Sequence, residues 1–172
     1  LKKDYGELND DSEQGEQMDF DILKRNLSML RTFDKAKLND DSLVSYRVFE
    51  SIAERDINAF EFRDQNYAIT HSWGVHSDLP SFMMNMHAVE SVDDAKAYVS
   101  RLNKFKQKIE WTIADLERGK KAGVVPLAFV FPAVIEAAQN LLRGQPYDKS
   151  MMKRPIWEDF EKKVKELKVD GK

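Results

Sequence analysis

Three histidines are the side chains of this protein best suited to binding a metal or moving a proton. They are His71, His76 and His87, and all lie in the stretch THSWGVHSDLPSFMMNMH. A zinc site built on one helix places two histidines four positions apart, as in HExxH, so that both imidazoles lie on one face. Here His71 and His76 are five positions apart, and His87 follows eleven positions later. We therefore expect hydrogen-bonding histidines in a packed loop, and the alternative is a three-histidine site formed by that loop.

Other catalytic motifs are absent from the chain. There is no cysteine, which excludes thiolate nucleophiles, thiolate zinc sites and disulfides. No GxSxG nucleophile elbow occurs, and LERGKKAG lacks the spacing of a phosphate-binding loop. The adjacent carboxylates of residues 93–94 and 158–159 lie at expected helix starts, where acidic side chains stabilise the helix. We predict no catalytic, cofactor-binding or metal-binding residue in this chain.

The composition indicates a folded protein with an ordinary surface. Of 172 residues, 42% are hydrophobic, which is enough to bury a core. The net charge of −3 gives no basic excess for a phosphate backbone, so no nucleic-acid partner is expected. The longest apolar run, VVPLAFVFPAVI, is too short for a bilayer and contains two prolines, so no transmembrane segment is expected. The chain begins with Leu1 and has no charged-then-apolar leader, which favours a processed protein or a fragment.

Hydrophobic periodicity predicts an all-α fold. Residues 1–18 are acidic and polar and are expected to form a flexible tail, followed by a helical domain over residues 19–172. Helices are expected from Asp19 to about Phe33, from about Asp41 to Arg63, from Ser91 to about Gly123, from about Ala128 to Arg143, and from Pro155 onward. The arrangement expected is a helical bundle-like region with one long loop.

The helix expected after Ser91 has the strongest periodic signal. Ser91 followed by Asp94 resembles a capping box in which Asp replaces Glu. Apolar residues then recur every three or four positions, which predicts that they form the buried face: Ala95, Tyr98, Leu102, Phe105, Ile109, Ile113 and Leu116.

The long loop spans Asp64 to Glu90 and contains the three histidines. Loops of this length inside compact domains usually carry a function. Gly74 would allow backbone angles that other residues avoid. We expect Asp78 to cap a short helix that ends near His87, with Pro80 in its first turn. His76 could then bond to a backbone carbonyl or to a bound peptide.

Several stretches of the chain, in order, resemble the N-terminal part of the bacterial domain-of-unknown-function 885 family. They are LVSYRVFESI, NYAITHSWGVHSDLPSFMMNMH, VESVDDAKAYVSRLNKF and DLERGKKAGVVPLAFVFPAVIEAAQNLL. Gly74, His76, Leu79 and Pro80 match a Gly-Gly-x-His-x-x-Leu-Pro-like loop, although Trp73 stands at its first glycine. Gly123, Val124 and Pro126 match a later turn. The resemblance covers about Asp19 to Leu142.

The resemblance implies a larger helical protein, similar to zinc-dependent peptidases of the zincin type. Members are often exported to the periplasm or cell envelope, many as lipoproteins. Zinc is implied for the full-length protein through a His-Glu motif in its C-terminal half, but no His-Glu pair occurs in this chain. The partners implied are that C-terminal half and a peptide substrate. Trp73, Gly74, His76 and Asp78 would then line one wall of a substrate cleft.

Two functions follow from the sequence. The first is a non-catalytic N-terminal helical portion of a zinc-dependent peptidase, inactive by itself. The alternative is a stand-alone helical binding module without enzymatic activity. The length of the reading frame after Lys172, and whether it contains a His-Glu motif, distinguishes the two.

Overall fold

The computed structural model describes residues 2–146, 148–149 and 151–167, and the all-α class is confirmed. Within these ranges there is no strand, and one isolated bridge pairs Gln145 with Lys153. The chain divides into two compact units. The hairpin unit is Asp10–Asn66, and the larger unit combines Leu1–Asn9 with Tyr67–Lys172.

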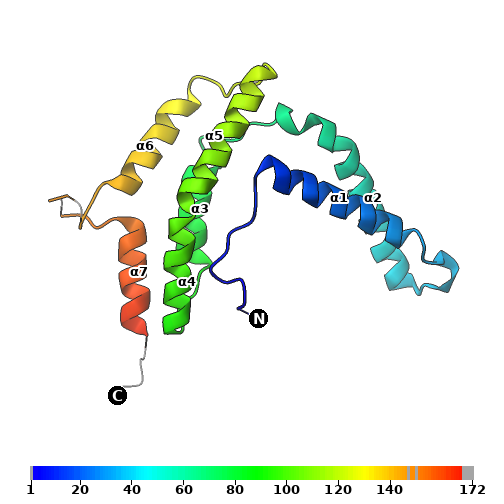
Figure 1. The fold of residues 1–172 in the computed structure, drawn as a ribbon, viewed down its shortest axis with the longest axis horizontal. Coiled ribbons are helices and arrows are strands. Elements are labelled where there is room, and N and C mark those ends of the chain that lie inside the picture. The colour runs from blue at the N-terminus through cyan, green and yellow to red at the C-terminus, as the bar shows by residue number, and fades with distance from the viewer. Residues whose placement is uncertain (1, 147, 150, 168–172) are drawn as a thin grey trace. The chain divides into compact units, whose positions relative to one another are not determined.

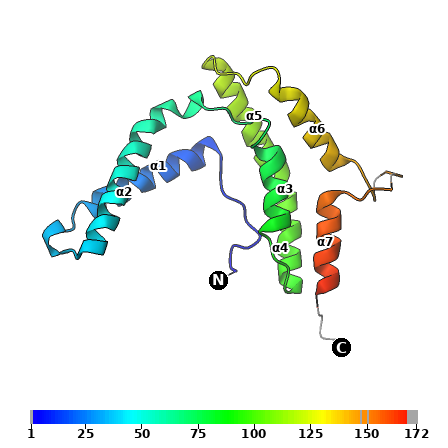
Figure 2. The same ribbon diagram turned by 180° about the vertical axis from the view of Figure 1, so that it is seen from behind.

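The hairpin unit consists of two helices that lie side by side (Figures 1 and 2). They are α1 (Glu13–Leu30) and α2 (Asp40–Ala59), and 3₁₀ turns follow each of them at Lys35–Lys37 and Phe60–Gln65. Leu27, Tyr46 and Ala53 are buried between the helices. Helix α2 begins at the predicted place because the Asn39 side chain accepts the Ser42 N–H at 2.8 Å.

Helix α1 begins earlier than predicted, inside the segment expected to be a flexible tail. The Ser12 hydroxyl accepts the Gly15 N–H at 3.1 Å and caps the helix at Glu13 rather than near Asp19. The last apolar position expected in this helix, Phe33, lies beyond its end and is exposed. Polar composition concealed this helix start, because a capped first turn needs few apolar residues.

The larger unit contains five helices in the described ranges. They are α3 (Val75–Asn85), α4 (Val92–Asn103), α5 (Phe105–Lys121), α6 (Val130–Leu142) and α7 (Pro155–Glu166). Helix α3 packs against α5, α6 and α7. Pro155 occupies the first turn of α7 as predicted, and Pro132 lies in the first turn of α6, where its missing N–H needs no partner.

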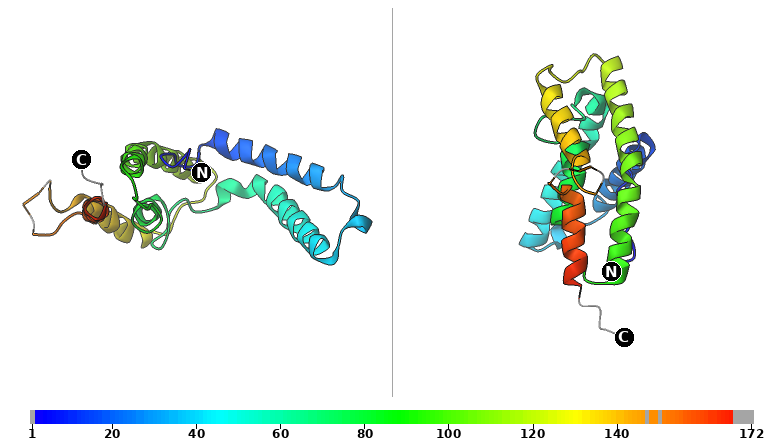
Figure 3. Two further views of the ribbon diagram at one scale, coloured as in Figure 1. Left: turned by 90° about the horizontal axis from the view of Figure 1, so that it is seen from below. Right: turned by 90° about the vertical axis from the view of Figure 1, so that its left-hand side faces the viewer.

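The helix predicted from Ser91 to about Gly123 is two helices, which lie nearly in line (Figure 3). The predicted cap at its start is confirmed, since Ser91 Oγ accepts the Asp94 N–H at 3.1 Å. At Lys104, ψ is −7° and the backbone N–H bonds to the carbonyls of Arg101 and Leu102, which tightens the last turn of α4. A tightened turn between two helices in line leaves the three- and four-residue spacing of apolar residues unchanged. Hydrophobic periodicity therefore does not reveal the break at Lys104.

The buried face of α4 and α5 differs from the predicted apolar stripe. Tyr98 is fully buried, but Leu102 is only partly buried and Ile109 and Ile113 are exposed. Arg101 and Lys108 are buried instead. They are covered by residues 2–9, which we call the strap and which lie along α4 and α5.

Hydrogen bonds to backbone carbonyls hold the strap in place. Arg101 Nε donates to the Glu7 carbonyl at 2.8 Å, Lys104 Nζ to the Gly6 carbonyl at 2.9 Å, and Lys108 Nζ to the Asn9 carbonyl at 3.2 Å. These bonds explain why cationic side chains are buried, because buried charges require polar partners. Across the described residues, no helix combines the length and apolar character needed to cross a bilayer.

Candidate functional site

The predicted cleft loop opens with a turn closed by Thr70. The Thr70 N–H donates to the Trp73 carbonyl at 2.9 Å, and its hydroxyl oxygen accepts the N–H groups of Ser72 at 3.2 Å and Trp73 at 3.1 Å. The turn holds the Trp73 side chain about half exposed, at 47%. Trp73 is therefore available to contact a ligand or another protein segment.

Gly74 joins this turn to α3 with backbone angles that other residues avoid. Its φ is +131° and its ψ is 175°, a region that is essentially restricted to glycine. A Cβ at this position would lie 3.0 Å from Ile69 Cγ2. The expectation that Gly74 supplies a special conformation is confirmed.

The start of α3 corrects the predicted role of Asp78. The helix begins at Val75 with Gly74 as its N-cap, so Asp78 and Pro80 lie inside it. The Asp78 carboxylate accepts the Gly74 N–H at 3.0 Å and the Ser77 hydroxyl at 3.1 Å. The predicted start of α3 was too late because an acidic residue near a helix start resembles an N-cap. Asp78 instead bonds to the Gly74 N–H from inside the first turn, where acidic side chains also interact favourably with the helix dipole.

The three histidines have separate surroundings. His71 lies near the exposed Phe129, with ring centroids 6.1 Å apart, and His87 is buried. His76 Nδ1 is buried without a hydrogen-bond partner among the described residues. In the ranges that the structure describes, no three His, Asp or Glu side chains are grouped to hold a metal.

His87 lies at the centre of a buried polar cluster that sequence reasoning missed. Its side chain is 1% exposed, with its Nδ1 2.7 Å from Arg101 Nη1 and its Nε2 3.1 Å from the Asp94 carbonyl oxygen. Arginine can only donate, so Nδ1 accepts and the Nε2–H donates, and the imidazole is neutral. Burial lowers the pKa of His87, and the charges of Arg101 and Lys163 act in the same direction, against the hydrogen bond to Asp94.

The cluster continues through Tyr98 to α7. The Tyr98 hydroxyl donates to Asp159 at 3.0 Å, and Asp159 pairs with Lys163 at 2.8 Å. Lys163 also donates to the carbonyls of Met83 and Met84, at 2.8 and 2.9 Å, in the last turn of α3. Burial raises the pKa of Tyr98, and the charge of Asp159 adds to the effect. These bonds join α3, α4 and α7, and we assign the cluster to holding the larger unit together.

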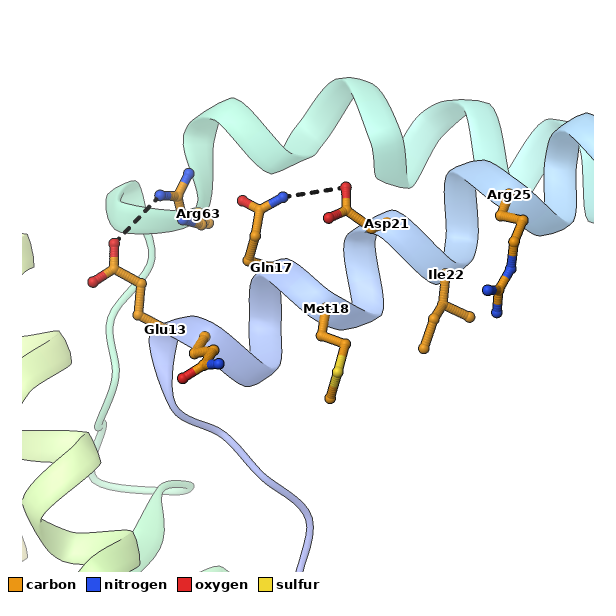
Figure 4. A pocket seen from close by; sticks show the side chains of 8 residues that line it. Glu13, Gln17, Met18, Asp21, Ile22, Arg25 and Arg63 are labelled. Carbon is orange, nitrogen blue, oxygen red and sulfur yellow. Dashed lines mark hydrogen bonds and ion pairs between the residues drawn. The ribbon is translucent and has the colours of Figure 1, made fainter.

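An open groove lies along α1 in the hairpin unit (Figure 4). It encloses about 800 Å³. Met18 and Ile22 lie on the side of α1 turned away from α2, and Glu13 pairs with Arg63 at 3.8 Å at one end. Its polar side chains do not converge on a point in the groove, so it lacks the arrangement expected of a catalytic centre.

Comparison with known families decides what the chain is related to. The family described as "Bacterial protein of unknown function (DUF885)" matches residues 1–171. The chain belongs to this family. The match is wider than the stretch from Asp19 to Leu142 that carried the resemblance. No curated protein and no solved structure matches this DUF885 chain.

Zinc content tests the prediction that this DUF885 chain has no metal site of its own. We expect the purified chain, dialysed against dilute zinc, to retain much less than one zinc per molecule by elemental analysis. The separate surroundings of His71, His76 and His87 are the reason. One tightly bound zinc per chain that is lost in both His71→Ala and His76→Ala would contradict the prediction.

Proposed function

We propose that this DUF885 chain is a non-catalytic helical portion of a larger zinc-dependent peptidase, and that its exposed apolar helix faces pack against the rest of that protein. The observation that carries the packing role is the exposed side of α6. The peptidase role rests on the family resemblance, which places the zinc motif in a part of the protein outside this chain.

Helix α6 is apolar on two sides. Its inner side, which includes the buried Val130, packs in the larger unit. Phe131, Ile135 and Leu142 recur on another side at helical spacing and are 38%, 54% and 66% exposed. A helix that met only water on that side would carry polar residues there. This exposed side supports a covering partner.

The apolar surface extends into the segment before α6. Val125, Leu127 and Phe129 are exposed there as well. Each large apolar side chain gains about 1.5–3 kcal/mol when it is fully buried. Six such residues within positions 125–142 are still 38–66% exposed, so part of this gain remains open to a covering partner.

The hairpin unit has a second unpartnered stripe. Val44, Val48 and Ile52 recur every four residues along α2, and all three are exposed. Large contiguous apolar surfaces on soluble proteins usually mark interaction sites. Exposed stripes in both units fit a scaffold portion better than a complete, self-contained enzyme.

The loop from Trp73 to Asp78 would form one wall of the peptide-binding cleft in the complete protein. Its exposed Trp73 offers a flat apolar contact for a substrate side chain, and the hydrogen bonds of Gly74 and Asp78 hold the loop in one conformation. The zinc and the catalytic groups would come from the C-terminal half. The same resemblance supports a location in the periplasm or cell envelope, with a lipid anchor at a removed N-terminus.

A charge placed on the α6 face tests the packing role. We expect the isolated chain to bind a hydrophobic dye and to self-associate, and Ile135→Glu to reduce both several-fold because the charge interrupts the apolar side. Asn140→Glu is the matched control, since it adds the same charge at an exposed polar position that lies five residues from Ile135, on another side of the helix. Dye fluorescence and sedimentation velocity measure the two effects.

Joining the chain to the rest of its protein tests the function itself. Dye binding should fall and zinc-dependent cleavage of peptides should appear in the joined protein. A chain whose Ile135→Glu and Asn140→Glu variants behave alike would contradict the α6 assignment. A reading frame that ends near Lys172 would instead favour the stand-alone binding module.

A further inference from the structure

One buried side-chain pair, His87 and Arg101, contacts the strap at both Tyr5 and Glu7. Arg101 donates through Nη1 to His87 Nδ1 at 2.7 Å and through Nε to the Glu7 carbonyl at 2.8 Å. The Tyr5 ring packs against the His87 ring with centroids 4.3 Å apart and a tilt of 33°, and the Arg101 guanidinium lies 4.9 Å from the centre of the Tyr5 ring. The position of the strap is therefore linked directly to the hydrogen-bonding state of His87.

Protonation of His87 would break this arrangement. The added proton belongs on Nδ1, because Nε2 already carries the hydrogen that bonds to the Asp94 carbonyl. An N–H at Nδ1 would face the N–H of Arg101, and two donors cannot share a hydrogen bond. Arg101 would have to withdraw, and it would take with it the bond to Glu7 and the stacking on Tyr5.

We propose that His87 and Arg101 form an acid-sensitive latch that holds the strap on α4 and α5 at neutral pH and releases it when His87 is protonated. This inference is independent of the proposed peptidase role. Release of the strap would uncover Arg101, Lys104 and Lys108, whose bonds to strap carbonyls occupy one side of α4 and α5. The acid form would thus expose a row of cations.

The charges around His87 favour release on protonation. Arg101 on α4 and Lys163 on α7 are cations that oppose a second positive charge. The rings of Tyr5 and Tyr98 pack against the His87 ring and carry no charge that could stabilise its protonated form. The Tyr5 ring also lies against the Arg101 guanidinium. Asp159 is paired with Lys163 and bonded to Tyr98, and Asp94 is paired with Lys2 at 2.8 Å. Glu7 offers its backbone carbonyl to Arg101, and Lys104 pairs with its carboxylate.

The sign of the pH dependence follows from the two states of His87. The strapped state holds the pKa of His87 below its usual 6.5, whereas the released state leaves the imidazole free to bind a proton. The strap is therefore fully held above about pH 6.5 and progressively lost as the pH falls below it. Lys2 lowers the pKa of Asp94, so that this carboxylate remains ionised across the same range.

Nuclear magnetic resonance on the whole chain tests the latch. Between pH 7.5 and 5 the equilibrium constant for opening the strap should rise by up to about 30-fold, from the ratio of proton binding in the two states. The readout is the nuclear Overhauser contact between the rings of Tyr5 and His87. Amides in the middle of α4 should keep their protection.

A non-titrating variant and a matched control complete the test. His87→Gln retains an acceptor for Arg101 and should remove the pH dependence, whereas His76→Gln should leave it unchanged. If His87→Gln fails to fold, the wild-type ring titration of His87 must still share its midpoint with strap opening. The proposal is overturned if the strap stays closed to pH 5, if α4 loses protection together with the strap, or if His87→Gln keeps the pH dependence.

Discussion

Replacement of Tyr98 by alanine is expected to lower the free energy of unfolding of the larger unit by about 3–5 kcal/mol, the range for removing a large buried aromatic side chain. Tyr98 is fully buried. Its ring centre lies 4.7 Å from that of Phe160 and 5.1 Å from that of His87. The substitution would leave a cavity between α4 and α7 and remove a hydrogen-bond donor from Asp159. Urea unfolding followed by circular dichroism measures the loss.

Two further variants separate the causes of that loss. Tyr98→Phe keeps the ring and removes only the hydroxyl, so we expect a loss of about 1–2 kcal/mol. Val99→Ala changes the adjacent residue, which is 43% exposed, and should cost about 0.5 kcal/mol or less. A Tyr98→Ala loss below about 1 kcal/mol would mean that the α4–α7 contact does not form in solution.

Replacement of Gly74 by alanine should have the second largest effect, about 3 kcal/mol. The backbone at Gly74 has φ +131° and ψ 175°, which costs a residue with a side chain about 1–3 kcal/mol. The added Cβ would also press against Ile69 Cγ2 at 3.0 Å and the Ile69 Cα at 3.2 Å. Either the turn that carries Trp73 or the start of α3 would have to shift.

Gly123→Ala provides the matched control for this prediction. Gly123 also has a positive φ, of +80°, but no atom lies within 4 Å of the position its Cβ would occupy. Its substitution should cost only about 1–2 kcal/mol, the ordinary penalty of a left-handed residue. Equal losses for the two variants would show that contact with Ile69 contributes nothing at Gly74.

The helices that the sequence predicted well are those with local signals. Asn39 caps α2 through a bond to a residue three positions away, and Pro155 fixes the first turn of α7. Such signals act within one turn, so they can be recognised without knowledge of the fold. The start of α3 was missed for a related reason, because Asp78 reaches back to Gly74 from inside the helix.

The strap and the His87 cluster could not be predicted because their contacts join distant residues. Arg101 bonds to a carbonyl 94 positions earlier, and Lys108 to one 99 positions earlier. A backbone carbonyl is present in every residue, so no side-chain pattern in residues 2–9 marks them as ligands for cations. Polar composition instead suggested a tail, and the apolar stripe on α4 and α5 suggested a different buried face.

One expectation about the loop from Trp73 to Asp78 is confirmed. The sequence singled out Gly74 for its backbone freedom, which the positive φ confirms. It could not assign the hydrogen bonds of His76 or Asp78, because these depend on where α3 begins. The role of Trp73, Gly74, His76 and Asp78 in a substrate cleft stays a proposal for the complete protein.

The position of the strap in the chain has a consequence for how the protein folds during synthesis. The strap precedes the hairpin unit, Asp10–Asn66, while the helices that bind it follow that unit. A ribosome adds about 5–20 residues per second, so the strap leaves it roughly 5–20 s before Arg101 and Lys108 do. Closing a loop of this length costs little more entropy than closing one half as long. The strap can therefore dock only after α4 and α5 have been synthesised, although it leaves the ribosome first.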